Sequence, residues 1–137
     1  MTAPKDRDWG KVQCVIEVAP ELAQGLLGLS DFSHAVVVTF LHGAHFEAAR
    51  HLTRRPQGRD DMPVVGIFAQ RAKDRPNPIG VTAVRVVSVV GGRVTVLGLD
   101  AIDGTPVLDI KPYYPQYDAP DEVTVPGWVN RLMENYF

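Results

Sequence analysis

Five short stretches of the chain are rich in apolar and β-branched residues, and this pattern predicts strands rather than helices. Residues 35–41 form a run of seven apolar and β-branched residues, which is too short and too branched for a buried helix. Residues 79–90 and 93–99 are separated by Gly91 and Gly92, a two-residue signal for a hairpin turn. Two further strands are predicted at residues 12–18 and 64–70.

The two runs of the predicted hairpin differ in how they distribute their apolar residues. In residues 93–99, Val94, Val96 and Gly98 share one face. Residues 79–90 carry valine on both faces, which predicts a strand covered by the core on one side and by a partner surface on the other. One face is predicted to hold Val81, Val87 and Val89, and the other Val84, Val86 and Val90.

The end of the chain changes to a helical pattern. Trp128, Leu132 and Tyr136 recur at a spacing of four, which predicts one stripe of an amphipathic helix that starts at Pro126. Shorter helical turns are expected at residues 20–24 and 44–52. Consecutive hairpin-like strands with few helices predict a mainly β fold, a small antiparallel β-barrel forming a single domain over residues 1–137.

Composition places the chain among globular proteins and limits its partners. Hydrophobic residues make up 45% of it and charged residues 22%. No apolar run approaches the roughly 18 residues that span a bilayer, and the first residues lack the apolar centre of a signal peptide, so we expect a cytoplasmic location. The single cysteine, Cys14, excludes an internal disulfide and is expected to be a small buried thiol. Because the net charge is −2, binding to nucleic acid would require a local basic patch.

The loop RPNPIG, residues 75–80, is stiff and polar. Arg75 and Asn77 each precede a proline, which favours extended backbone at both positions. Arg71, Lys73 and Arg75 recur at a spacing of two, so an extended chain would project the three cations together. This arrangement predicts a seat for a carboxylate or a phosphate. The alternative is a solvated run of charge on a surface loop.

A second polar loop starts with DGTP, residues 103–106, and continues into a charged strand. The Asp-Gly pair by itself signals only a turn. In an extended strand, Asp109, Lys111 and Tyr113 point to one side, within reach of each other. The intervening Leu108 and Ile110 are expected to pack on the other side. The trio favours a functional site, and a buried ion pair with a purely structural role is the alternative.

Signatures of metal sites and of common nucleotide folds are missing from the sequence. The four histidines, His34, His42, His45 and His51, form no spacing typical of metal ligands, and we expect no metal. The chain contains no GxGxxG, P-loop or GxSxG motif. Neither a doubly wound nucleotide-binding fold nor a serine hydrolase is therefore predicted.

Three segments together resemble the TsaA/TrmO-like family: GIFAQRAKDRPNPIG (66–80), LDAIDGTPVLDIKPYYP (99–115) and DFSH (31–34). The resemblance covers about residues 9 to 118. It implies an S-adenosylmethionine-dependent methyltransferase on a small antiparallel β-barrel, with the cofactor bound near a homodimer interface and no metal. The best-known members of the family methylate the threonylcarbamoyl-modified adenosine beside the tRNA anticodon.

The resemblance also implies which residues hold the cofactor. These cofactor contacts are His42, Gly43, Arg71, Val81, Asp100, Ala101, Ile102 and Asp103. Among the residues that match the motifs, we infer catalytic roles for Asp103, Asn77, Lys111 and Tyr113. We infer substrate contacts for Arg75, Lys73 and Asp109. Asp103 would orient the cofactor or take up a proton late in methyl transfer.

Two departures from the family pattern bear on function. Only residues 1–8 precede the first matching strand, so an extra N-terminal strand and its cofactor-contacting loop are expected to be missing. A C-terminal domain that many bacterial members carry is also expected to be absent. Methylation of tRNA therefore competes with two alternatives, methylation of a small molecule or another RNA, and a non-catalytic cofactor-binding barrel.

Overall fold

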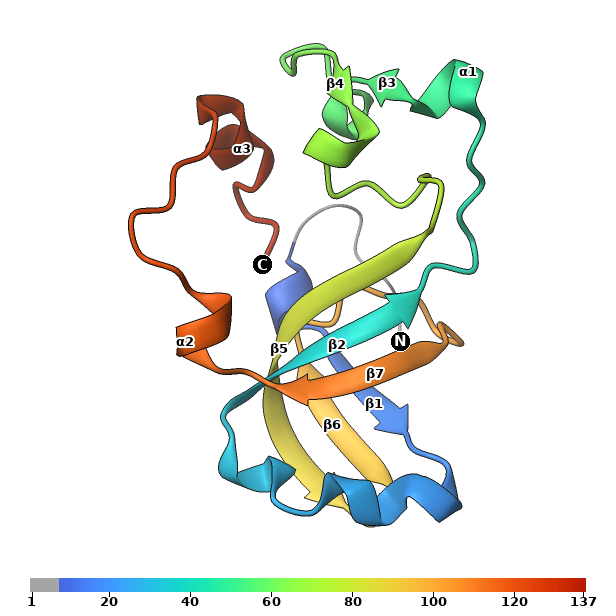
Figure 1. Cartoon of the computed structure of the whole chain (residues 1–137), viewed down its shortest axis with the longest axis vertical. Helices are drawn as coiled ribbons and strands as arrows, with labels where there is room; N and C mark the ends of the chain where they lie inside the picture. Colours follow the sequence, from blue (N-terminus) through green and yellow to red (C-terminus); the bar gives the residue numbers. More distant parts are fainter. Residues whose placement is uncertain (1–7) are drawn as a thin grey trace.

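Five antiparallel strands form the main sheet, and smaller elements lie around its ends (Figure 1). The computed structural model describes residues 8–137. In sheet order the strands are β1 (Gln13–Glu17), β6 (Arg93–Leu97), β5 (Ile79–Val90), β2 (His34–Phe40) and β7 (Val107–Pro112). A second sheet pairs β3 (Thr53–Arg54) with β4 (Val65–Gly66). The helices are α1 (Ala48–His51), α2 (Pro115–Asp118) and α3 (Gly127–Leu132), and 3-10 turns cover Trp9–Lys11, Pro20–Leu26, Leu29–Asp31, Pro56–Gly58 and Ile67–Ala69.

The predicted hairpin is present between β5 and β6. Val90 pairs with Arg93 across the two glycines, and Gly91 has a φ of 61°, in the left-handed region that glycine adopts without strain. On β6, Val94 and Val96 are fully buried, as the alternation predicts. The sequence pattern therefore specified both the turn and the inward face of this strand.

The predicted faces of β5 are wrong in its second half. The register between β5 and β6 shifts after Val86, which is a bulge that reverses the alternation of side chains. As a result Val84, Val86 and Val89 pack in the core, whereas Val87 and Val90 are 50% and 70% exposed. The bulge exchanges the predicted faces of Val89 and Val90.

The main core lies inside the curled sheet and draws on both of its edges. Alternate residues of β2 are buried, and Ala35 and Val37 are both 0% exposed. Ile16 of the edge strand β1 belongs to the core cluster, and Ile110 of the other edge strand, β7, packs against it. The fold is mainly β and antiparallel, as predicted. Within residues 8–137 no ladder of hydrogen bonds joins β1 to β7.

Residues 42–78, which we call the arm, leave the end of β2 and return at β5, forming the upper part of the view in Figure 1. The strand predicted over residues 64–70 is largely wrong. Only Val65 and Gly66 are extended, and a 3-10 turn follows at Ile67–Ala69. The partner strand β3 has two residues, so a longer ladder would have no partner here.

The arm has a small core of its own. Met62 and Ile67 are each 1% exposed, and the arm also buries the polar side chains of His51 and Gln70. The Gln70 Nε2 group donates to one backbone carbonyl in β3 and one in β4, each at 3.0 Å. A polar side chain therefore joins the two short strands.

The C-terminal helix begins at Gly127, one residue after the predicted start at Pro126, and it ends at Leu132 rather than at Tyr136. Asn135 has a φ of 60°, which is outside the helical region. Beyond the helix, the backbone N–H of Trp9 donates to Tyr136 O at 2.7 Å. The end of the chain therefore pairs with the segment before β1 instead of extending the helix.

The region before β1 is described only in part. The predicted absence of an extra strand concerns residues 1–8, and of these Asp8 alone is among the described residues. Between residues 8 and 137, no helix has the length and apolar character needed to cross a membrane.

Candidate functional site

Three of the predicted site segments meet at the C-terminal end of β2, which we call the candidate site. Leu41 N–H donates to Pro78 O in the RPNPIG loop at 2.7 Å, and Phe40 N–H donates to Pro106 O in the DGTP turn at 2.9 Å. The two exposed residues that follow are His42 and Gly43. Because β2 lies between β5 and β7, the loops that adjoin those two strands reach the same place.

Close packing at this end of β2 depends on Gly80. A Cβ atom at this position would lie 2.6 Å from Thr39 Oγ1 and 3.1 Å from Leu41 Cδ2. The first distance is shorter than real side-chain contacts, so glycine allows β5 to approach β2 here. The last residue of the RPNPIG motif thus has a packing role.

The two arginines around the RPNPIG loop have different partners. Arg75 Nη1 donates to the carbonyl oxygens of Gln70 and Ala72, at 3.0 and 2.9 Å. Arg71 Nη2 donates to Val81 O at 2.6 Å. The guanidinium of Arg75 therefore fastens its own loop, whereas Arg71 and Val81, both predicted cofactor contacts, are brought together.

Asp74 lies at the centre of a charged cluster that was not predicted from the sequence. Its Oδ1 atom accepts the His45 N–H at 2.9 Å and lies 3.4 Å from Lys73 Nζ. Its Oδ2 atom is 3.8 Å from His51 Nε2 and 3.9 Å from Arg54 Nη1. The Asp74 side chain is only 16% exposed. These contacts connect the start of the arm, α1 and β3 with the loop before RPNPIG.

Asp74 stays ionised despite this burial. Desolvation alone would raise its pKa, but the His45 N–H and the Lys73 ammonium outweigh that effect, and the pKa of Asp74 lies below its ordinary value. A signal for this role exists in the sequence, since Asp74 is the one acidic residue among Arg71, Lys73 and Arg75. Of the three cations at spacing two, Lys73 contacts the Asp74 carboxylate, whereas Arg71 and Arg75 donate to backbone carbonyls.

His51 is held in one tautomer beside Asp74. Its Nδ1 atom accepts the backbone N–H of Glu47 at 2.9 Å, so Nδ1 carries no proton. The Glu47 carboxylate also contacts His45 Nε2 at 3.0 Å and Arg50 Nη1 at 3.5 Å. Within residues 8–137, no group of three or more His, Cys, Asp or Glu side chains is placed to hold a metal ion.

The loop between β6 and β7 forms a tight turn that carries four predicted cofactor contacts. Ala101 is 8% exposed in the main core, and Ile102 is 52% exposed. The N–H and the hydroxyl of Thr105 both donate to Ile102 O, at 3.2 and 2.6 Å, and Gly104 has a φ of 81°. Asp103 lies exposed at the tip of this turn.

The two carboxylates of this loop contact different parts of the molecule. Asp100 Oδ2 accepts a hydrogen bond from the hydroxyl of Tyr136. Burial raises the pKa of the Cys14 thiol in β1, and the negative charge of Asp103 raises it further by a smaller amount. A thiol with a raised pKa remains protonated and is a poor nucleophile. Cys14 is half-buried, whereas the prediction was a buried thiol.

Asp109 and Lys111 form an exposed ion pair on β7. Lys111 Nζ lies 2.7 Å from Asp109 Oδ2, and the two side chains are 64% and 48% exposed, respectively. The hydrogen bond from Lys111 lowers the pKa of Asp109, and the same bond raises the pKa of Lys111. The alternative of a buried structural ion pair is therefore wrong.

Leu108 departs from the predicted alternation, since it is 56% exposed rather than packed. Val38 pairs with Asp109 but Thr39 pairs with Val107, so the register of β7 on β2 shifts at this point. This bulge leaves Leu108 without a paired position, and Val107 packs against the core in its place.

Tyr113 lies at the opposite end of β2 from the candidate site. Its N–H donates to His34 O at 3.1 Å, and its ring centre is 6.2 Å from that of His34. His34 and Phe40 begin and end β2, so about 20 Å separates the two ends at the rise of an extended strand. Asn77 lies exposed in the RPNPIG loop. Within one chain the structure does not bring Tyr113 together with Asn77 and Asp103.

The side chains near the candidate site are of kinds that fit a nucleoside cofactor such as the resemblance implies. Phe40, Ile79 and Val81 are 42%, 46% and 45% exposed and offer apolar surface for a purine ring. Asp100 and Asp103 offer carboxylate oxygens for hydroxyl or ammonium donors and negative charge for a sulfonium. These side chains are therefore compatible with the binding of S-adenosylmethionine.

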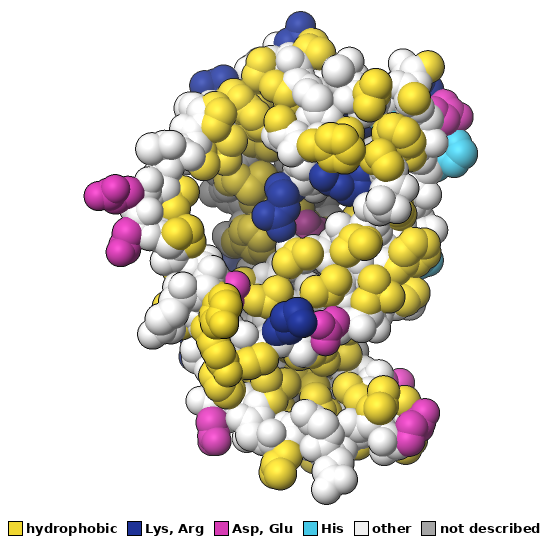
Figure 2. Space-filling model, in the orientation of Figure 1, with side chains coloured by type: hydrophobic (Ala, Val, Ile, Leu, Met, Phe, Trp, Pro, Cys, Tyr) yellow, Lys and Arg dark blue, Asp and Glu magenta, His cyan; other side chains and the backbone are white. Residues whose placement is uncertain are grey.

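Figure 2 shows hydrophobic side chains gathered over β5, β2 and β7 on the face turned to the viewer. It also shows a hollow between this face and the C-terminal segment, with Lys or Arg side chains at its edge. The exposed apolar residues of the three strands are Phe40, Ile79, Val81, Val87, Val90 and Leu108. An apolar face of this kind is typical of a surface that a partner covers.

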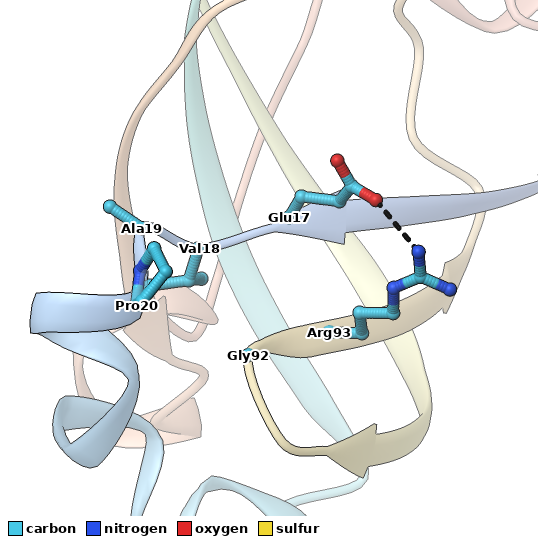
Figure 3. Close-up of a pocket in the computed structure, with 6 residues that line it drawn as sticks. All are labelled: Glu17, Val18, Ala19, Pro20, Gly92 and Arg93. Carbon is cyan, nitrogen blue, oxygen red and sulfur yellow. Dashed lines mark hydrogen bonds and ion pairs between the residues drawn. The ribbon is translucent and has the colours of Figure 1, made fainter.

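Two shallow pockets lie away from the candidate site. One, of about 410 Å³, is lined by Glu17, Val18, Ala19, Pro20, Gly92 and Arg93 (Figure 3). An ion pair of 3.1 Å between Glu17 and Arg93 crosses its edge. The other, of about 210 Å³, is lined by residues 25–29 and by Phe32, Ile110 and Pro112. Neither pocket contains a predicted cofactor contact. We therefore locate the candidate site by the meeting of the motif loops and not by these pockets.

Comparison with known proteins identifies related sequences over most of the chain. Residues 2–119 match the family described as the tRNA-methyltransferase O N-terminal domain. A probable S-adenosyl-L-methionine-binding protein of Pyrococcus abyssi is 38% identical over 120 residues, which cover 88% of this chain and 62% of that protein. A tRNA (adenine(37)-N6)-methyltransferase of Homo sapiens is 39% identical over 101 residues, which cover 74% of this chain and 22% of that protein.

A solved structure supports the same relation. The crystal structure of TrmO from Pseudomonas aeruginosa superimposes with a TM-score of 0.66 at 33% identity, covering 85% of this chain and 48% of that one. The chain thus spans less than two thirds of the length of all three of these proteins.

Proposed function

We propose that this chain, which belongs to the tRNA-methyltransferase O N-terminal domain family, is an S-adenosylmethionine-dependent methyltransferase that acts on an adenine of tRNA. The observation that carries the proposal is the convergence of the RPNPIG loop, the DGTP turn and residues 42–43 at the end of β2. The family resemblance places the cofactor contacts at residues 42–43, on either side of the RPNPIG loop, and in the residues that lead into the DGTP turn.

The proposed acceptor is N6 of a threonylcarbamoyl-modified adenosine beside the anticodon. The mouse and human relatives are named tRNA (adenine(37)-N6)-methyltransferases, which supports the nitrogen and the position. The threonylcarbamoyl group comes from the TsaA/TrmO-like resemblance, and it carries a carboxylate. The ammonium of Lys73, which is 63% exposed, is a suitable partner for that carboxylate. Arg75 would act indirectly, since its guanidinium holds the carbonyls of its own loop.

The chemistry requires alignment more than activation. Bound S-adenosylmethionine supplies a methyl group activated by a sulfonium, and the methyl–sulfur bond breaks with its electron pair on sulfur. Placing the acceptor nitrogen in line with that bond can contribute about 7–11 kcal/mol. In our proposal Val81 and Ile79 hold the purine ring, and Asp100 and Asp103 accept hydrogen bonds from the cofactor. The Asp103 carboxylate is the proposed acceptor of the proton that the methylated nitrogen releases.

The arm is the surface that we propose for contact with RNA. Seven of the 14 Lys and Arg residues lie in residues 42–78, against four of the 16 Asp and Glu residues. The side chains of Arg50 and Lys73 are 71% and 63% exposed. Such side chains bind phosphates and make affinity depend on salt. A chain with a net charge of −2 thus has the local excess of positive charge that a tRNA substrate requires, and we propose that it acts in the cytoplasm.

A homodimer with shared sites is the assembly that we propose. Val81 and Val87 of β5 are 45% and 50% exposed, on the strand that carries valine on both faces. Exposed apolar faces of this kind often form interfaces, and two-fold homodimers are the commonest assemblies. A partner chain would also be needed to bring Tyr113 to the candidate site. Light scattering should give twice the 15.0 kDa of one chain, and a monomer at micromolar concentration would contradict the shared site.

We also propose that the curled sheet is closed into a barrel by side chains rather than by a ladder. The support is the common core, to which β1 contributes Ile16 and against which Val107 and Ile110 of β7 pack. One domain over residues 1–137 remains part of this proposal.

Methyl transfer to tRNA tests the function directly. The purified chain is incubated with methyl-labelled S-adenosylmethionine and tRNA, and the tRNA nucleosides are then analysed by mass spectrometry. We expect labelled N6-methyl threonylcarbamoyladenosine from tRNA that carries the modification, and none from tRNA that lacks it. Asp103→Ala should abolish the product, and Asp121→Ala, which removes another exposed carboxylate, should retain it.

The other outcomes separate the alternatives. Label on unmodified adenosine would keep the tRNA methyltransferase and remove the requirement for threonylcarbamoyl. Label found only on a small molecule would show that the substrate is not tRNA. Cofactor binding without transfer to any acceptor would favour a non-catalytic binding protein.

A further inference from the structure

The segment that follows the family match reaches the candidate cofactor loop. The match ends at residue 119, and residues 120–137 carry α3 and the end of the chain. From this segment, the hydroxyl of Tyr136 donates a hydrogen bond to Asp100 Oδ2. A side chain outside the matched region therefore contacts a predicted cofactor contact.

The Tyr136 backbone is fixed by packing against the segment before β1. Its carbonyl oxygen accepts the N–H of Trp9 at 2.7 Å, and Trp9 is itself only 6% exposed. The backbone of Phe137 approaches Gly10 so closely that a Cβ on that glycine would lie 2.8 Å from the Phe137 carbonyl carbon. The phenol therefore extends from a fixed position.

Asp100 is fixed from the other side. Its neighbours Leu99 and Ala101 are 5% and 8% exposed in the main core, and Ala101 N–H donates to Leu99 O at 3.0 Å across it. The backbone on both sides of Asp100 is therefore held, which limits where its carboxylate can lie. The hydrogen bond from the Tyr136 hydroxyl further restricts the orientation of that carboxylate.

We propose that Tyr136 is a positioning residue for the cofactor site. Its hydroxyl holds the Asp100 carboxylate in the orientation that accepts a hydrogen bond from the bound nucleoside cofactor. A carboxylate has about four acceptor positions, so the phenol and a donor group of the cofactor bind it together. Orienting the acceptor before binding reduces the ordering cost of association. This inference rests on the proposed function and makes Tyr136, from the segment after the family match, part of the site.

The test is a double-mutant cycle on cofactor affinity. The dissociation constant of S-adenosylmethionine is measured by calorimetry for the unaltered chain, Tyr136→Phe, Asp100→Ala and the double variant. Tyr136→Phe removes one hydroxyl, and we expect about a two- to tenfold weaker affinity, the range that one hydrogen bond contributes. In the Asp100→Ala background the same change should have no further effect. Tyr117→Phe, on a side chain that is 82% exposed, is the matched control and should leave affinity unchanged.

Each other result overturns the inference in a recognisable way. Unchanged affinity of Tyr136→Phe, in a chain that binds the cofactor, leaves the contact a structural one and the proposed function intact. Tighter binding by Tyr136→Phe makes the phenol a competitor of the cofactor. An equal loss with and without Asp100 means that Tyr136 acts by another route. Failure of the unaltered chain to bind S-adenosylmethionine removes both this inference and the proposed function.

Discussion

The main sheet buries many valine, isoleucine and leucine side chains against one another, whereas the arm buries few apolar side chains and is also held by polar side chains that bond to backbone carbonyls. In the sheet, Val37, Val94 and Val96 are fully buried. In the arm, Gln70 bridges β3 and β4, and Arg75 bonds to two carbonyls of its own loop. Apolar burial stabilises the sheet without directional requirements, and the arm depends on directed contacts that hold the motif loops in place.

We expect this difference in burial to make the two regions open differently. Core strands usually open only when the whole domain unfolds, while segments with few apolar contacts open locally. The arm has only Met62 and Ile67 as fully buried large apolar side chains. The candidate site lies where the two regions meet, so we expect the side formed by the arm to open more readily than the side formed by the sheet.

The largest expected effect is a contrast between two buried isoleucines. Ile16→Ala removes packing from the main core and should lower the free energy of global unfolding by about 2–5 kcal/mol. Ile67→Ala should instead reduce hydrogen-exchange protection in the arm, with a small change in global unfolding. Denaturant titration and hydrogen exchange measure the two, and Val90→Ala, at a 70% exposed position, is the neutral control.

If Ile67→Ala lowered the free energy of global unfolding as much as Ile16→Ala does, the proposed difference between the arm and the sheet would be contradicted. The arm and the sheet would then unfold as one unit.

A smaller effect is expected at the boundary between the regions. Gly80→Ala places a Cβ 2.6 Å from Thr39 Oγ1, which should cost about 1–3 kcal/mol as an overpacked contact. The change lies where β2 meets the RPNPIG loop, so both stability and cofactor affinity should fall. Gly127→Ala, where a Cβ meets nothing within 4 Å, is the control. Retention of full stability by Gly80→Ala would mean that the two strands can separate without cost.

Acid should weaken the arm before the sheet through Asp74. Because the folded state lowers the pKa of Asp74, the carboxylate stabilises the fold above its unfolded pKa of about 3.9. That contribution is lost as the pH falls through the lower, folded value. Hydrogen-exchange protection of residues 42–78, corrected for intrinsic rates, should fall in this range. In Asp74→Asn the fall should be smaller, and an identical acid profile in that variant would exclude Asp74 as its cause.

The smallest effect on stability is expected at the exposed ion pair of β7. Lys111→Met should leave the thermal midpoint unchanged within replicate error, because exposed ion pairs contribute little. Methyl transfer should nevertheless fall if the predicted catalytic role of Lys111 is correct. Full activity in a stable Lys111→Met chain would remove that residue from the catalytic set.

The strands of the sheet were predictable because one local rule determines them. A short apolar and β-branched run located β2, alternation identified the inward face of β6, and Gly91 with Gly92 located the hairpin. The errors at Val89 and Leu108 have a shared cause, since a bulge reverses the alternation and depends on the partner strand. A pattern in one strand carries no information about that register.

Only those parts of the site that belong to a recognisable sequence motif were predictable. The RPNPIG and DGTP loops were found from the sequence, and their meeting at the end of β2 follows from the strand order. The cluster around Asp74 was missed because its partners, His45, His51 and Arg54, lie 20 or more residues away in the sequence. Polar contacts over such distances leave no periodic pattern.

The central claim is that the cofactor binds where the loops of the arm and the sheet meet, and mapping its binding amide by amide tests this most directly. Nuclear magnetic resonance spectra of the labelled chain are recorded during titration with S-adenosylmethionine. The account predicts shifts in the amides of residues 42–43, 71–81 and 100–103, and none around the ion pair of Glu17 and Arg93. Shifts confined to the pocket beside that ion pair, or no shifts at saturating cofactor, would contradict it.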